Sequence, residues 1–127
     1  MSSRSTVNGI VLFAHGSRDP QWHQPMQQVA ERIRQLDPQV QVRCAYLELT
    51  EPDLPTCADE LIRAGINSIT IIPMFLGVGR HAREDLPRLL ADLQTAHPAV
   101  HFRLQPAIGE DARVLDLLAR TALDGTQ

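Results

Sequence analysis

Two histidines and one glutamate lie at equal intervals along this 127-residue chain. Glu48 follows His15 by 33 residues, and His81 follows Glu48 by another 33. Imidazole and carboxylate groups bind first-row divalent metals such as cobalt, iron, nickel and zinc, and three protein ligands leave coordination positions open for a substrate. If the fold brings the three side chains together, the chain has a candidate metal site.

Four short apolar runs are the elements that must position these residues. They predict β-strands over residues 9–14, 40–47, 68–75 and 100–105, each bounded by Gly, Pro, Asn or Asp. The first and third runs are almost entirely apolar, which is typical of central parallel strands covered on both faces, whereas QVQVRCAYLEL alternates and fits a position nearer the edge. We therefore expect an α/β fold with strand order 2-1-3-4.

Helices are predicted between and after the strands, where apolar residues recur with helical spacing. The apolar positions run from Met26 to Leu36, from Leu54 to Ile62 and from Leu86 to Leu93, and a last segment near 111–123 is expected to close the sheet. Pro25 indicates a late or kinked start of the first helix. Together the elements predict one flavodoxin-like domain over residues 1–127, with a flexible start over 1–7.

The crevice beyond the carboxyl ends of the strands is where open α/β sheets bind ligands. His15 follows the first strand, Glu48 ends the second and His81 follows the third, so the equal spacing predicts equivalent positions on three neighbouring strands. A single histidine after a strand is usually a hydrogen-bonded loop residue, but three aligned positions favour a metal site. The other histidines are expected outside the crevice: His23, His97 and His101.

Composition excludes several other classes of protein. With a net charge of −3, the chain lacks the excess of positive charge that binding to nucleic acid or to an anionic membrane requires. Cys44 and Cys57 form no CxxC pair, which argues against a zinc ribbon, an iron–sulfur cluster or a disulfide framework. The start MSSRSTVNG has no apolar signal core, and no apolar run approaches the ~18 residues of a membrane span, so we expect a cytoplasmic protein with a small ligand.

Three stretches carry a resemblance to a known family. AHGSRDP, AYLELTEP and PMFLGVGRHAREDLP, in this order and spacing, resemble the short sirohydrochlorin chelatases of the CbiX and SirB type, and the match covers most of the chain. The third stretch is the most specific. The resemblance implies a class II chelatase that inserts cobalt or ferrous iron, or in related archaeal members nickel, into sirohydrochlorin without ATP, for cobalamin or sirohaem synthesis. No organic cofactor is implied, since the metal is a substrate.

The resemblance also implies roles for particular residues. His15 and His81 would bind the incoming metal, and Glu48 would be an active-site carboxylate that accepts or relays the two pyrrole protons. The substrate carries eight carboxylates around an apolar ring, which calls for apolar contacts and arginines. The candidates for substrate binding are Ser17, Arg18, Glu48, Leu76, Gly77, Val78, Gly79, Arg80 and His81, with Phe75 and Arg83 nearby.

Glycines and caps near these motifs have their own expected roles. Gly77 and Gly79 can take unusual backbone angles that let a flat ring approach the loop over 76–80, and an ordinary strand-to-helix turn is the equal alternative for either glycine. Asp19 reads as a helix cap before Pro20, and Glu84 and Asp85 suit a helix start before Pro87.

Chain length predicts the assembly. One lobe of 127 residues is small for enclosing a large tetrapyrrole, so we expect a homodimer with its active sites near the interface.

Two alternative functions stay open. A carrier that binds metal or tetrapyrrole without catalysis would use the same residues. A flavodoxin-like phosphate binder is disfavoured, because the chain has neither a GxGxxG motif nor any lysine.

Overall fold

The four strands form one parallel sheet in the order β2-β1-β3-β4. The structure is a computed structural model that describes residues 6–126 apart from the side chain of His81; most of the segment expected to be flexible lies outside these residues. The strands are β1 (Asn8–Ala14), β2 (Gln41–Tyr46), β3 (Ser68–Pro73) and β4 (His101–Leu104). The α/β class and the strand order are confirmed, and three of the strands end one or two residues short of the predicted limits.

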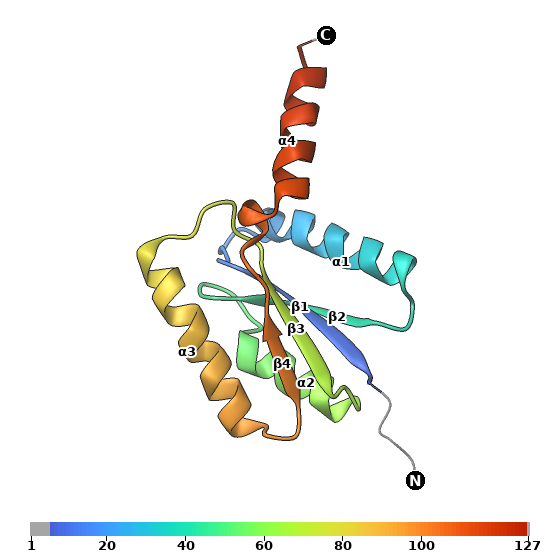
Figure 1. Ribbon diagram of the computed structural model, residues 1–127, viewed down its shortest axis with the longest axis vertical. Coiled ribbons are helices and arrows are strands. Elements are labelled where there is room, and N and C mark those ends of the chain that lie inside the picture. Colours follow the sequence, from blue (N-terminus) through green and yellow to red (C-terminus); the bar gives the residue numbers. More distant parts are fainter. Residues whose placement is uncertain (1–5, 127) are drawn as a thin grey trace.

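Helices cover both faces of the sheet (Figure 1). The helices are α1 (Gln24–Leu36), α2 (Leu54–Arg63), α3 (Arg80–Ala96) and α4 (Ala112–Asp124), with 3-10 turns η1 (Pro20–His23) and η2 (Ile108–Glu110). One apolar layer joins α1 to β1 and β2 through Leu12, Met26 and Val42. The opposite layer joins α2 and α3 to the sheet. Within residues 6–126, no helix is both long and apolar enough to cross a membrane.

Local sequence signals explain most of the helix starts. The Asp19 carboxylate accepts a hydrogen bond of 3.0 Å from the N–H of Gln21, and Pro20 opens η1 as predicted. Pro25 lies in the first turn of α1, where its missing N–H costs nothing. The third helix begins at Arg80, before Pro87, but Glu84 and Asp85 lie beyond its first turn and not at its start as expected. Pro87 lies inside the helix, which continues past it although a proline removes one helical donor and crowds the preceding turn.

Helix α4 does not close the sheet, contrary to the expectation from its apolar pattern. It leaves the body of the protein and projects away from it (Figure 1). Its main packing partner is η2, and none of its residues is buried. The pattern of apolar residues identified the helix correctly but could not say what its apolar face contacts.

We expect Asp53→Ala to lower the free energy of unfolding by about 0.5–2 kcal/mol, because the carboxylate caps α2 by accepting a 2.9 Å hydrogen bond from the N–H of Thr56. Hydrogen bonds from the side chain of Thr56, and then from its N–H, lower the pKa of Asp53, so the contribution of the carboxylate is full above the ordinary carboxyl pKa and is lost as the pH falls through the lowered value. Urea denaturation at pH 7 measures the change. Asp53→Asn is the control, since it keeps a capping oxygen; an equal loss in both variants would contradict the capping role.

Candidate functional site

The loops that follow β1 and β2 are joined by backbone hydrogen bonds. The N–H of Leu47 donates to the carbonyl of Ala14 at 2.9 Å, and the N–H of Glu48 donates to the carbonyl of His15 at 3.0 Å. Gly16 follows with φ of 96°, and a Cβ there would overlap the carbonyl oxygen of Glu48. Only glycine fits this position, so Gly16 lets the loops carrying His15 and Glu48 lie against each other.

The imidazole of His15 is exposed but rests on a rigid support. Its ring centroid lies 4.2 Å from that of Phe75, with 31° between the ring planes. Phe75 is only 3% exposed, and its carbonyl accepts a 3.0 Å hydrogen bond from the N–H of Gly109. A buried aromatic ring thus orients an imidazole that solvent or a ligand can reach.

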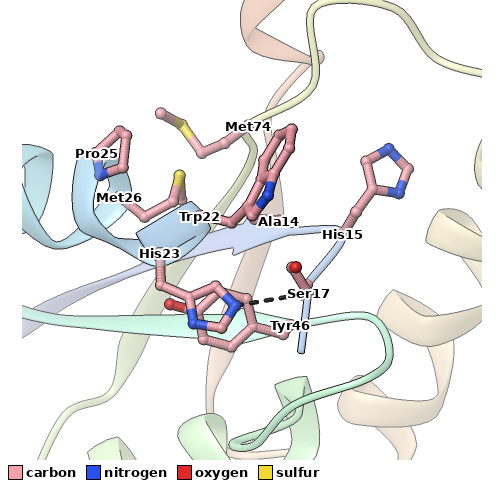
Figure 2. A pocket seen from close by; sticks show the side chains of 10 residues that line it. Ala14, His15, Ser17, Trp22, His23, Pro25, Met26, Tyr46 and Met74 are labelled. Carbon is pink, nitrogen blue, oxygen red and sulfur yellow. Dashed lines mark hydrogen bonds between the residues drawn. The ribbon is translucent and has the colours of Figure 1, made fainter. Parts of the chain in front are cut away.

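An open pocket of about 430 Å³ lies beside His15. Figure 2 shows His15 at one side of the pocket and Pro25 at the other in this view, with Trp22 between them. The pocket is lined by Ala14, His15, Gly16, Ser17, Trp22, His23, Pro25, Met26, Tyr46 and Met74. Trp22 is 72% exposed although it is the largest apolar side chain in this set. A large exposed indole beside two methionines suits a flat apolar ligand.

His23 belongs to this pocket, so the expectation that it lies outside the crevice was wrong. Its Nε2 accepts a 3.2 Å hydrogen bond from the N–H of Ser17, which requires a neutral ring with the proton on Nδ1. Its ring also stacks on Tyr46 at 4.5 Å, and burial raises the pKa of that phenol. Asp19 and Pro20 start η1 soon after β1, so that His23 lies beside the end of that strand. This Asp-Pro pair is the sequence signal that could have placed His23.

The remaining predicted residues lie in loops around the carboxyl ends of the strands. Glu48 is exposed on the bend two residues after β2, and Ser17 and Arg18 follow His15. The segment from Leu76 to Gly79 lies in the loop between β3 and α3, and Arg80 is the first residue of α3. The structure does not place their side chains against one another.

The glycines of the β3–α3 loop take ordinary backbone angles, which agrees with the alternative of a plain strand-to-helix turn. Gly79 has φ of −71° as the N-cap of α3, and neither it nor Gly77 has a positive φ. A Cβ at either position would meet open space. The left-handed glycine of the site is Gly16, which lies in the first motif.

Equal spacing in the sequence does not place His15, Glu48 and His81 at equivalent positions relative to the ends of their strands. Leu12 pairs with Ile72 on β3, so the position opposite His15 is taken by Phe75. His81 comes six residues later, in the first turn of α3. Its side chain is outside the described residues, so its convergence with His15 and Glu48 stays a prediction. Among the described side chains, no group of three His, Cys, Asp or Glu residues is placed to hold a metal.

Cationic side chains lie near the start of α3. Arg80 and Arg83 are exposed, and with Val78 and Glu84 they line a second hollow of about 450 Å³. Arg18 is exposed in the loop after β1. An accessible imidazole, an apolar pocket and nearby guanidinium groups together suit a planar apolar ligand whose edge carries carboxylates.

Comparison with known proteins gives consistent results. The CbiX family model matches residues 9–124. A sirohydrochlorin cobaltochelatase of Sulfolobus acidocaldarius is 29% identical over 114 residues, covering 90% of this chain and 89% of its own. One from Methanococcus aeolicus is 33% identical over 84 residues, covering 66% of this chain and 59% of its own.

Solved structures show the same lobe. The crystal structure of a CbiX protein from Marinobacter aquaeolei VT8 superposes with a TM-score of 0.79 at 33% identity, covering 94% of this chain and 93% of that one. The cobalt complex of the sirohydrochlorin chelatase SirB from Bacillus subtilis subspecies spizizenii superposes with a TM-score of 0.76 at 24% identity, covering 92% of this chain but 50% of SirB. The match of the family model over nearly the whole described chain shows that this protein belongs to the CbiX family.

Proposed function

We propose that this protein is a sirohydrochlorin chelatase, an enzyme that inserts a divalent metal into the tetrapyrrole without ATP. The observation that carries the proposal is the exposed imidazole of His15, held on Phe75 at the edge of an open apolar pocket. Curated relatives named sirohydrochlorin cobaltochelatases support the substrate and favour cobalt as the metal. Iron and nickel are the next candidates.

Metal insertion requires that water leaves the ion, that ring nitrogens replace it, and that two pyrrole protons are removed. His15 offers a nitrogen lone pair to the incoming ion, and His81 is the proposed second ligand. Glu48 lies on the loop bonded to the backbone of His15, so its carboxylate is the proposed acceptor of the protons. The metal is a substrate here, and the chain needs no organic cofactor.

Binding of the macrocycle would use two kinds of contact. Trp22, Met26 and Met74 offer apolar surface to the ring. Ser17 and Arg18 in the loop after β1, and Arg80 at the start of α3, are proposed partners for the peripheral carboxylates, together with the segment from Leu76 to Gly79. The cobalamin or sirohaem pathway and a cytoplasmic location stay predictions.

We expect His15→Ala and His81→Ala each to reduce metal insertion by about 10²–10⁴-fold, because each removes a proposed ligand or proton-transfer group. The absorbance change of sirohydrochlorin on metal insertion measures the rate. His101→Ala is the matched control, since that exposed imidazole is the first residue of β4. It therefore lies at the amino ends of the parallel strands, whereas the proposed site lies at their carboxyl ends. Full activity in either site variant would refute its assignment, and circular dichroism checks that the variants fold.

Comparing Gly16→Ala with Gly65→Ala distinguishes the effect of the contact between Gly16 and the Glu48 carbonyl from the effect of a positive φ alone. Both glycines have φ near 95°, but a Cβ at Gly65 meets open space, whereas at Gly16 it overlaps the Glu48 carbonyl. Both variants should lose about 1 kcal/mol or more of stability. Only Gly16→Ala should also lower metal insertion, by at least tenfold, because it forces the loops of His15 and Glu48 apart. Equal activities in the two variants would contradict this role of Gly16.

A comparison of cobalt, ferrous iron and nickel with sirohydrochlorin under anaerobic conditions tests the proposal as a whole. Insertion with every metal should exceed the rate without protein, and cobalt should be fastest. Binding of metal or sirohydrochlorin without acceleration would identify a carrier instead. Faster insertion of nickel or iron would keep the chelatase assignment and correct the metal.

A further inference from the structure

His23 holds the loop that carries His15 through a bond to the backbone of that loop. His15 directly follows β1, and the N–H of Ser17, two residues later, donates to Nε2 of His23 at 3.2 Å. Figure 2 shows this bond as a dashed line, with the imidazole of His15 pointing away from that of His23 in this view. The contact of His23 is thus with the backbone beside the proposed metal ligand.

Tyr46 sets the position of the His23 ring. The two ring centroids lie 4.5 Å apart, with 41° between the ring planes. Tyr46 is only 5% exposed, and as the last residue of β2 it pairs with Ala14, the residue before His15. Its N–H also donates to the carbonyl of Pro52 at 2.9 Å. A buried ring that belongs to the sheet therefore orients the imidazole of His23.

The segment between Ser17 and His23 is held by its own hydrogen bonds. The N–H of Asp19 donates to the hydroxyl of Ser17 at 3.0 Å, and the N–H of Gln21 donates to the Asp19 carboxylate at 3.0 Å. The N–H of Trp22 donates to the carbonyl of Asp19 at 3.1 Å. Together with the bond from Ser17 to His23, these contacts close the segment on itself. A shift of Ser17 then requires either that η1 moves with it or that the bond to His23 breaks.

The backbone around His15 is therefore held from two sides. The carbonyl of His15 accepts a hydrogen bond from the N–H of Glu48 on the side of β2. On the other side the N–H of Ser17 is bound to His23, and Gly16 between them has a left-handed φ of 96°. The direction in which the chain leaves His15 is thus set by both bonds. Misplacing a reacting group by 1 Å can lower a rate by about 10²-fold, so this support matters for chemistry at the imidazole of His15.

We propose that His23 is a positioning residue, which acts through the N–H of Ser17 to set the backbone that presents the imidazole of His15 to the incoming metal. The kinetic consequence rests on the proposed chelatase function, but the hydrogen bond and the tautomer that it requires belong to the free protein. What His23 supplies is an acceptor. Another side chain that places an acceptor at the same point should therefore replace it in part.

Two substitutions separate the acceptor from the ring. His23→Phe keeps an aromatic ring on Tyr46 but has no acceptor, whereas His23→Gln carries its amide oxygen the same number of bonds from Cα as Nε2 but has no ring. We expect kcat for metal insertion to fall about tenfold or more in His23→Phe, with little change in the KM for sirohydrochlorin. In His23→Gln, kcat should be at least about fivefold higher than in His23→Phe.

His97→Phe is the matched control for the loss of an imidazole. His97 is half-buried after the end of α3, and its ring faces Phe102 at 6.2 Å, at the amino ends of the strands. This variant should insert metal at the rate of the parent. A parental kcat in His23→Phe, or equal losses in the two His23 variants, would overturn the proposal. A raised KM with unchanged kcat would also overturn it, because it would indicate direct contact of His23 with the macrocycle.

Nitrogen-15 NMR of the unsubstituted protein tests the hydrogen bond without any activity. At pH 8 the imidazole of His23 should carry its proton on Nδ1, and the amide proton of Ser17 should exchange about tenfold more slowly than in His23→Phe. A proton on Nε2 would overturn the proposal even if the variants failed to fold, which circular dichroism detects. An inactive parent would refute the chelatase proposal alone, because the tautomer decides separately whether His23 holds Ser17.

Discussion

The hydrogen bond from the N–H of Glu48 to the carbonyl of His15 is the contact on which the proposed site depends. It forms because Gly16 has no side chain and takes a left-handed conformation that leaves the Glu48 carbonyl undisturbed. Without it, only the bond from the N–H of Leu47 to the carbonyl of Ala14 would join these two loops. With it, the position of a carboxylate-bearing loop is set by the backbone of the histidine that it is proposed to assist.

A second constraint on His15 comes from β3, the strand on the other side of β1 from β2. Phe75 is buried at the position where register would place the counterpart of His15, and its ring supports the imidazole. The site therefore combines a polar junction toward β2 with an apolar support toward β3. The three neighbouring strands β2, β1 and β3 each contribute one part through their carboxyl ends, as is usual in open α/β sheets.

Most of the fold could be predicted because burial leaves a periodic signature. The apolar runs around Leu12 and Ile71 identified the central strands, and the alternation around Arg43 placed β2 at the edge. The pattern could not distinguish a helix that packs on its own sheet from one that packs elsewhere, so α4 was misplaced. Glu84 and Asp85 were placed at the start of the third helix, whereas α3 begins at Arg80 and continues past Pro87.

The candidate site was predicted less completely, for physical reasons that differ among residues. His15 followed from its place directly after an apolar strand. Trp22 and His23 were missed because a tight turn, not periodicity, returns η1 to the pocket. For His81 the equal spacing was misleading, since this residue lies inside α3, eight residues beyond the end of β3, whereas His15 directly follows β1 and Glu48 lies two residues after β2. The number of residues between two side chains does not fix their positions along the sheet, because those positions depend on where each strand ends and on strand register.

The close packing of Gly109 against Leu76 has a further consequence. The segment from Phe75 to Gly79 borders the proposed binding region, and the same peptide groups anchor η2, from which α4 emerges. A movement of this segment would therefore require η2, and with it the start of α4, to adjust. The backbone beside the proposed site and the base of the projecting helix form one packed unit.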